Sequence, residues 1–228
     1  MTPINYNSSS SFTRIVFPKG AMPETDSSQP AQLSPLLIVI SGPSAVGKDA
    51  VVQRLLADGD SFQFVVTVNT RPPRPGERPG VDYHFVTKEQ FQQMVADGKM
   101  LEYAAVYDDF KGVPRSGVRQ ALASGKDVVL RLDVQGAATI RRLCPEALLI
   151  FLAPESESVL LERMRSRPGD KPESLELRFA MFQQEMLCIE DFDYVVPNRT
   201  GQLDRTVEVI RAIIAAEHHR VHPRKVSL

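Results

Sequence analysis

Two hydrophobic periods alternate along residues 36–220. Short continuous apolar runs predict buried strands, and apolar residues recurring every three to four positions predict amphipathic helices. The expected strands cover residues 36–40, 64–68, 81–86, 100–106, 127–132, 148–152 and 194–196. The expected helices cover residues 49–58, 87–97, 115–124, 137–143, 156–167 and 203–220, and a further helix begins at 174. Strands that alternate with helices of this length predict an α/β fold with a parallel sheet flanked by helices.

Three segments depart from this alternation. Residues 1–34 are rich in serine and proline, which predicts a disordered tail, with a transit peptide as the alternative. Residues 69–114 contain short strands and a single helix, which predicts a small mixed α+β insertion between core segments 35–68 and 115–220. Residues 221–228 are expected to be a C-terminal tail. We interpret His218, His219 and His222 as part of a solvated basic end, in preference to a metal site.

The loop that follows the first strand has the pattern of a phosphate-binding loop. Its sequence, Gly42-Pro43-Ser44-Ala45-Val46-Gly47-Lys48, brings backbone N–H groups toward an anion, and the lysine reaches the terminal phosphates. The dipole of the following helix favours the same anion. Asp49 stands where the full motif has the serine or threonine that binds magnesium. Ala45 replaces a glycine, and we expect it to be tolerated only with a negative φ.

A proline-rich stretch over residues 69–80 carries Arg71, Arg74 and Arg78. Its prolines and glycines exclude regular structure. Arginine binds phosphate through two parallel hydrogen bonds, so this stretch suits a preorganised phosphate clamp. A solvated loop explains the same residues, and both interpretations remain open at this point. Asp133 follows a buried strand and is expected at the carboxyl edge of the sheet, where ligands bind in such folds.

The composition argues against two classes of binding partner. The chain of 228 residues has a net charge of -1, with 43% hydrophobic and 24% charged residues. This balance is ordinary for a globular protein and argues against general binding to nucleic acid or to membrane surfaces. No apolar run reaches the ~18 residues that a membrane-spanning helix needs. We therefore expect neither partner, and the oligomeric state stays open.

From residue 36 to about 216 the chain resembles the guanylate kinase family, the P-loop nucleoside monophosphate kinases that phosphorylate GMP with ATP. The resemblance rests on the phosphate-binding loop, on residues 70–77 and 80–86, on Asp133-Val134-Gln135-Gly136, on the arginines of residues 162–167, and on residues 193–198. It implies a GMP-binding insertion and a helical lid at about residues 163–178. It also implies transfer of the γ-phosphoryl group of ATP to GMP, and to dGMP, in purine metabolism.

The resemblance assigns roles to individual residues. Catalytic roles fall on Lys48, Arg71, Arg163, Arg167 and Arg178. ATP binding falls on residues 42–49 (Gly42, Pro43, Ser44, Ala45, Val46, Gly47, Lys48, Asp49) and on Asn198. GMP binding falls on Thr67, Arg71, Arg74, Glu77, Tyr83, Glu102, Lys111 and Asp133. Glu102 is implied to face the Watson–Crick edge of guanine, because a carboxylate accepts from two donors there that adenine does not offer together.

Several positions depart from the family pattern. Asp49 implies that magnesium, the expected cofactor with ATP, is held by this carboxylate directly or through water. Lys111 stands where the family often has a tyrosine, Val113 replaces a hydroxyl residue, and Arg131 stands where an acid is common. A non-catalytic phosphopeptide-binding module of the same fold is the alternative to an enzyme. The expected location is the cytoplasm, or an organelle if the N-terminal tail is a transit peptide.

Overall fold

The structure is a computed structural model. It describes residues 34–57, 59, 61–106, 108–165 and 174–228, with side chains for all of these except residues 174–178. Expectations for residues 1–33, including the tail and the transit-peptide alternative, lie outside the described residues. None of the helices within the described ranges combines the length and apolar character needed to cross a membrane.

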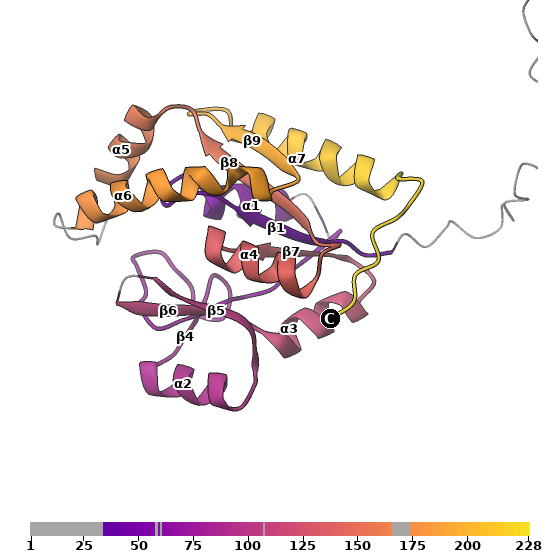
Figure 1. Cartoon of the computed structure of the whole chain (residues 1–228), viewed down its shortest axis with the longest axis horizontal. Helices are drawn as coiled ribbons and strands as arrows, with labels where there is room; N and C mark the ends of the chain where they lie inside the picture. The colour runs from indigo at the N-terminus through magenta and orange to yellow at the C-terminus, as the bar shows by residue number, and fades with distance from the viewer. Residues whose placement is uncertain (1–33, 58, 60, 107, 166–173) are drawn as a thin grey trace, which may run out of the picture. The chain divides into compact units, whose positions relative to one another are not determined.

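The central element is a five-stranded, fully parallel sheet (Figure 1). Its order is β2 (Phe62–Phe64), β7 (Asp127–Arg131), β1 (Leu37–Ser41), β8 (Leu148–Pro154) and β9 (Tyr194–Asn198). Every residue of β1 is buried, as expected for a central strand that is covered on both faces. The parallel arrangement places the carboxyl ends of all five strands at one edge.

Helices cover both faces of this sheet, and alternate residues of β1 point to opposite faces. Ile38 and Ile40 join one apolar core, and Leu37 and Val39 join another. The first core is completed by α1 (Lys48–Leu56), α5 (Glu157–Arg165), α6 (Ser174–Leu187) and α7 (Leu203–His218), and the second by α3 (Arg115–Ala123) and α4 (Val134–Leu143). A short 3₁₀ helix, η1 (Cys188–Asp191), leads from α6 toward β9. The predicted fold class is confirmed.

A second sheet of four strands is built from the segment between β2 and α3. Its order is β4 (His84–Phe85), β3 (Val68–Asn69), β6 (Asp109–Pro114) and β5 (Met100–Val106). Phe91 of α2 (Lys88–Ala96) packs with Val68 and Met100 in a small core of its own. Thr87 and Gln90 form a capping box at the start of α2, because the Thr87 side chain accepts from the Gln90 backbone and the Gln90 side chain accepts from the Thr87 backbone.

Three element predictions in this region are wrong. The expected strand 64–68 is split, because β2 joins the parallel sheet and β3 joins the second sheet. No strand is expected between residues 106 and 127, yet β6 forms there and pairs antiparallel with β5. The expected strand 81–86 is reduced to His84–Phe85. In each case long-range strand pairing, which local residue patterns do not report, decides the outcome.

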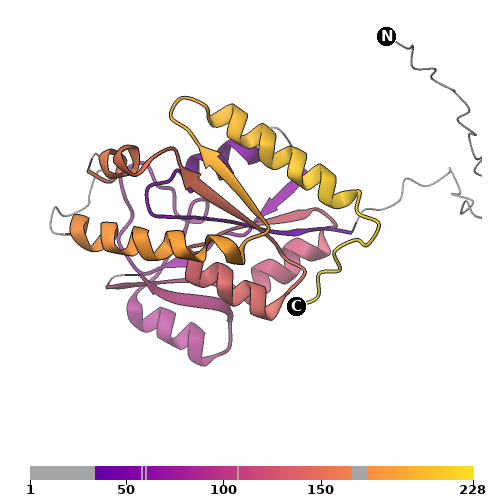
Figure 2. The same cartoon turned by 45° about the horizontal axis from the view of Figure 1, so that its top comes forward.

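The prediction of a solvated basic C-terminal end is wrong for His218 and Arg224, although His219 and His222 are exposed. Nε2 of His218 lies 2.8 Å from Oδ2 of Asp127, and both side chains are largely buried. Arg224 is buried and pairs with Glu217 at 2.6 Å. Val226 and Leu228 pack against the second core, and both views show the C-terminal end lying beside α3 (Figures 1 and 2). Apolar contacts and a buried counter-ion thus hold this segment against the domain.

Candidate functional site

The phosphate-binding loop follows β1 directly and adopts the conformation that its glycines predict. Gly42 has φ 133° and Gly47 has φ 101°, a region that glycine enters at no steric cost. A Cβ on Gly42 would collide with the backbone carbonyl oxygen of Leu152 in β8. The loop can therefore turn tightly over β8 and bring the N-terminus of α1 to the carboxyl edge of the sheet.

Ala45 lies in the middle of this loop and has φ 64°. The expectation that an alanine here requires a negative φ is wrong. A left-handed conformation costs about 1–2 kcal/mol for a residue with a Cβ. The loop therefore keeps the backbone path that a glycine would take and carries a small local strain.

Lys48 folds back into the loop. Its Nζ donates to the carbonyl oxygens of Gly42 at 2.5 Å and Pro43 at 2.9 Å. Burial lowers the pKa of Lys48 from 10.5 to about 8, although the nearby carboxylates Glu185, Asp49 and Asp133 act in the opposite direction. A phosphate beside Nζ would favour the charged form in the same way.

Two predicted residues hold the loop from outside through one backbone atom, the carbonyl oxygen of Val46. Nδ2 of Asn198 donates to it at 2.8 Å and Nη1 of Arg163 at 3.3 Å. Nη2 of Arg163 also donates to Oγ1 of Thr200 at 2.8 Å. Asn198, at the end of β9, and Arg163, in the last turn of α5, therefore fix the position of the loop relative to the sheet.

On the other side of the site, Arg71 and Glu77 form the centre of the arginine-rich segment. The two side chains make hydrogen bonds at 2.7 and 2.6 Å, and the Arg74 backbone N–H donates to Glu77 at 2.8 Å. Burial acts to raise the pKa of Glu77, but these hydrogen bonds outweigh it and hold the pKa below its ordinary value. The segment is therefore preorganised, and Glu77 contacts the arginines.

Tyr83 is buried among cations. The guanidinium carbon of Arg71 lies 5.1 Å from the centre of its ring, that of Arg131 lies 4.4 Å away, and Nζ of Lys111 lies 5.9 Å away. Burial raises the pKa of the Tyr83 phenol. A phenol surrounded in this way stays neutral and can donate a hydrogen bond to a bound anion.

Glu102 of β5 lies at the far end of the site. It is 5% exposed, and within the described residues its Oε2 is buried with no hydrogen-bond partner. Gly136 leaves room for this carboxyl group, because a Cβ at that position would lie 3.0 Å from Oε2. Burial, and then the charge of Asp133, raises the pKa of Glu102 from 4.5 to about 8. A buried acceptor without a partner marks a position where a ligand donor would be stabilised.

Asp133 and Lys111 lie between the two ends. Asp133 caps α4 by accepting from the Gly136 backbone N–H at 2.9 Å. Burial lowers the pKa of Lys111, while Asp133 and then Asp49 act to raise it. Thr67 is 3% exposed and sits just before β3.

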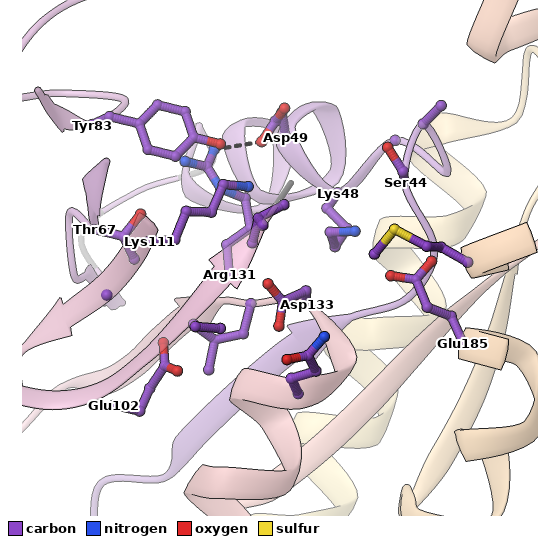
Figure 3. A pocket seen from close by; sticks show the side chains of 18 of the residues that line it. Ser44, Lys48, Asp49, Thr67, Tyr83, Glu102, Lys111, Arg131, Asp133 and Glu185 are labelled. Atoms are coloured by element: carbon purple, nitrogen blue, oxygen red, sulfur yellow. Dashed lines mark ion pairs between the residues drawn. The ribbon is translucent and has the colours of Figure 1, made fainter. Parts of the chain in front are cut away.

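Asp49, in the first turn of α1, pairs with Arg131 of β7, with 2.7 Å between Oδ1 and Nη1 (Figure 3). Within the described residues there is no group of three or more acidic, histidine or cysteine side chains that could hold a metal ion by themselves. Mg²⁺ often keeps several waters and binds one or two carboxylates together with substrate phosphates. Asp49 and Asp133 are the carboxylates of the loop edge that could take that part.

A cavity of about 470 Å³ joins these groups. Figure 3 shows Ser44 and Lys48 at one end, Glu102 at the other, and Asp133 between them. The predicted site residues that line it are Ser44, Ala45, Gly47, Lys48, Asp49, Thr67, Tyr83, Glu102, Lys111, Asp133 and Arg163. Arg71, Arg74, Glu77 and Asn198 do not line it in the described structure. Arg71 contacts the ring of Tyr83, which lines the cavity, and Asn198 donates to the Val46 carbonyl of the loop. Glu77 contacts Arg71 and the Arg74 backbone.

A family model described as guanylate kinase matches residues 34–217 of the chain. The chain belongs to the guanylate kinase family. A guanylate kinase of Oryza sativa subsp. japonica, named chloroplastic/mitochondrial, is 45% identical over 213 residues, which cover 92% of this chain and 75% of that protein. The guanylate kinase of Bacillus subtilis is 43% identical over 193 residues, which cover 83% of this chain and 94% of the relative.

A solved structure supports the same family assignment. The crystal structure of guanylate kinase from Anaplasma phagocytophilum matches with a TM-score of 0.68 at 28% identity, and the match covers 82% of this chain and 88% of that one. The family resemblance of the sequence and the nucleoside monophosphate kinase fold are therefore confirmed. The roles of single residues in this guanylate kinase site remain predictions.

The sequence missed two residues of this guanylate kinase site. In the sequence Arg131 stands out only as a departure from the family pattern, and no motif includes Glu185. The Glu185 carboxylate, on α6, accepts a hydrogen bond from the Ser44 backbone and interacts with Lys48, while burial raises its pKa. Only the contacts made in the fold bring these residues to the loop.

The predicted lid is described in part. Arg163 is placed at the loop, as given above. Arg167 lies outside the described residues, and the side chain of Arg178 does too. Their expected contact with ATP phosphates stays a prediction.

Proposed function

We propose that this member of the guanylate kinase family transfers the γ-phosphoryl group of ATP to GMP, and to dGMP, giving ADP and GDP or dGDP. The observation that carries the proposal is one cavity with Lys48 at one end and the partnerless carboxyl oxygen of Glu102 at the other. The first end suits a triphosphate, and the second suits the paired N–H donors of guanine.

At the donor end, the loop N–H groups and the dipole of α1 bind the phosphates of ATP. Lys48 supplies a positive charge to the phosphoryl group in transit. Arg163 and Asn198 hold the loop through the Val46 carbonyl. Arg167 and Arg178 are proposed to add charge from the lid.

At the acceptor end, Tyr83, Arg71 and Arg74 bind the phosphate of GMP, and Glu77 keeps the two arginines in position. Glu102, with Thr67 nearby, reads the base. Lys111 and Asp133 lie between the two nucleotides. No general base is needed, because the attacking atom is an already ionised phosphate oxygen, and catalysis consists of in-line positioning and charge stabilisation.

Magnesium is proposed to enter with ATP, held by the phosphates, by water and by Asp49 or Asp133. When bound, it neutralises charge on the phosphoryl oxygens. The residues of the chain do the rest, because they orient both phosphates and line a cavity from which water is displaced when the nucleotides bind.

A coupled assay with ATP and either GMP, dGMP, AMP or UMP tests the proposal. We expect turnover of GMP and dGMP only, and a purified protein that does not turn over GMP would refute it. Lys48→Ala should lower kcat by about 10² or more, since it removes a charge that acts on the transition state. Glu102→Gln should reduce the preference for GMP over AMP by orders of magnitude, as expected when a hydrogen-bonded site loses its matched acceptor.

Glu208→Gln is a matched control for both variants. Glu208 is an exposed residue of α7 that pairs with Arg205 at 3.1 Å, and it does not line the cavity. Its kcat and base preference should equal those of the unmodified enzyme. The alternative of a phosphopeptide-binding module is not favoured, because the curated relatives described above are named as kinases.

The partners that we propose are the small molecules ATP and GMP. We propose the cytoplasm as the location, and the printed name of the rice relative, chloroplastic/mitochondrial, supports an organelle as the alternative. Mass spectrometry of the N-terminus of the native protein decides between them, since a cleaved transit peptide would leave a shortened chain.

A further inference from the structure

The ion pair between Asp49 and Arg131 joins the two halves of the site. Asp49 follows Lys48 in the phosphate-binding loop and its side chain is 46% exposed, whereas the side chain of Arg131 is 4% exposed. An arginine buried to this degree is destabilised unless its charge is paired and its N–H groups are bonded. Asp49 therefore supplies a counter-ion for Arg131. We call residues 69–85, which are proposed to bind the phosphate of GMP, the acceptor segment, and Arg131 contacts Asp82 and Tyr83 of this segment.

The guanidinium group of Arg131 makes hydrogen bonds along its edge and ring contacts across its plane. Along the edge, Nη1 meets Asp49 at 2.7 Å and Nη2 donates to the carbonyl oxygen of Asp82 at 2.8 Å. Across the plane, the guanidinium lies 4.4 Å from the ring centre of Tyr83 and 5.3 Å from that of Phe64. Only a planar, forked cation can make these contacts at the same time, so a lysine would not replace it.

The contacts continue from Tyr83 into the phosphate clamp. Arg71 stacks on Tyr83 at 5.1 Å and makes a side-chain hydrogen bond with it. A second link runs from the same helix, because Nε2 of Gln53 donates to Oδ1 of Asp82 at 3.3 Å. Helix α1 of the donor half is thus connected to the acceptor segment through Arg131 and through Asp82.

We propose that Arg131 is a positioning residue for acceptor binding, and that Asp49 holds it in place. Arg131 contacts the same Tyr83 ring that Arg71 contacts and holds it in place, so that Tyr83 and Arg71 meet the acceptor phosphate without reorganisation. Asp49 belongs to the donor loop by sequence, but its charge serves the acceptor. The inference rests on the proposed function, in which Tyr83 and Arg71 bind the phosphate of GMP.

Two roles for Asp49 give different results in the same experiment. If Asp49 mainly held magnesium, Asp49→Asn would change the concentration of magnesium or of ATP that gives half-maximal rate. If Asp49 holds Arg131, Asp49→Asn changes the KM for GMP and leaves the dependence on ATP and magnesium within about twofold. Calorimetric titration of GMP into the full chain gives Kd without chemistry and separates binding from turnover.

The test uses Asp49→Asn, Arg131→Gln, Arg131→Lys and the double variant Asp49→Asn/Arg131→Gln. Each variant should raise the KM and Kd for GMP by about tenfold, within the range for contacting residues of one network. The double variant should be no worse than Arg131→Gln, because both changes break the same contact. Arg131→Lys should fail to restore GMP binding, because its charge is kept and its fork is lost.

Arg54→Gln is the matched control. Arg54 lies on the same helix and pairs with Asp204 at 2.6 Å, and it does not line the cavity. Its constants for GMP should equal those of the unmodified enzyme. Should the Arg131 variants fail to fold, Asp49→Asn, a change at a half-exposed residue, decides the question alone.

Three results would overturn the inference. They are additive effects in the double variant, normal GMP binding in Arg131→Lys, and a change in ATP or magnesium dependence alone in Asp49→Asn. Failure of the proposed function looks different, since the unmodified chain would then not phosphorylate GMP at all. An active enzyme whose Asp49→Asn variant binds GMP normally would refute only this inference.

Discussion

Arg71 and Glu77 are joined through both of their forks, with Nη1 of the arginine 2.7 Å from Oε2 and Nη2 2.6 Å from Oε1 of the glutamate. Their side chains are 13% and 17% exposed. The pair holds Arg71, which we propose binds the acceptor phosphate, in one rotamer before any ligand arrives. An arginine that must be ordered on binding loses rotamer entropy, of which it carries about 2 kcal/mol.

The first prediction follows from this pair. Glu77→Ala should raise the KM for GMP by about tenfold, because Arg71 keeps its charge and loses its orientation. Steady-state kinetics with GMP as the varied substrate measure the effect. Asp97→Ala, at an exposed residue that pairs with Lys99, is the control and should leave the KM unchanged. A lower KM in Glu77→Ala would mean that Glu77 competes with the phosphate.

The second prediction concerns pH and the carboxyl group of Glu102. Its pKa of about 8 means that much of it is protonated at neutral pH, whereas guanine requires the carboxylate. Between pH 7 and 8.5, where the GMP phosphate is already ionised, the Kd for GMP should fall roughly eightfold as the ionised fraction rises. Calorimetry across this range measures it, and Glu102→Gln should show no such dependence.

The same group predicts a change in stability. The pKa of Glu102 is higher in the folded protein, about 8, than the 4.5 of an unperturbed glutamate. The folded state therefore binds this proton more tightly, and the contribution of Glu102 to the free energy of unfolding declines as pH rises from 4.5 to 8. Urea unfolding should show a smaller decline with pH for Glu102→Gln. An equal decline in both proteins would contradict the prediction.

The third prediction concerns Ala45. With φ 64°, its left-handed backbone costs about 1–2 kcal/mol, and glycine would remove that cost while adding about 0.4–1 kcal/mol of unfolded-state entropy. Ala45→Gly should therefore raise the free energy of unfolding by up to about 1 kcal/mol, read from the urea midpoint at constant m-value. Ala57→Gly, at a residue with φ -67°, should lower it. A destabilised Ala45→Gly variant would contradict a strained alanine.

The fourth prediction concerns the ion pair of Glu217 and Arg224, whose side chains are 3% and 8% exposed. Arg224→Met removes the closest charged partner of the buried Glu217 carboxylate, which keeps the Tyr194 hydroxyl at 2.7 Å and Arg220 at 3.3 Å. The free energy of unfolding should therefore fall by up to about 3 kcal/mol. The double variant Glu217→Gln/Arg224→Met should recover part of that loss. Neither residue lines the cavity, so the KM values should not change. A loss below about 0.5 kcal/mol would show that the pair is dispensable.

Signals that are local in the sequence predicted the phosphate-binding loop and the irregular arginine-rich segment. Gly42 and Gly47 mark backbone positions that only glycine tolerates, and Lys48 follows at a fixed spacing, so the loop could be placed from a few residues. The prolines around Arg71 excluded regular structure in the same way. The alternation of apolar runs predicted the parallel sheet, because covered strands are apolar throughout.

Features that depend on partners distant in sequence were missed. The segment of β6, with Asp109 and Gly112, has the composition of a turn, and only pairing with β5 makes it a strand. Arg131 and Glu185 gain their roles from Asp49 and Ser44, which lie on other elements. The charged residues around Arg224 predict a solvated tail, because no local sequence pattern indicates that its partner Glu217 is buried.

The position of Tyr83 has an optical consequence. The chain contains no tryptophan and five tyrosines, so its near-ultraviolet spectrum comes largely from tyrosine. Tyr83 is 6% exposed and is ringed by Arg71, Arg131 and Lys111, which makes its transition sensitive to any anion that changes this field. Near-ultraviolet circular dichroism titrated with inorganic phosphate, which does not absorb there, should therefore report occupancy of the acceptor phosphate site without a label.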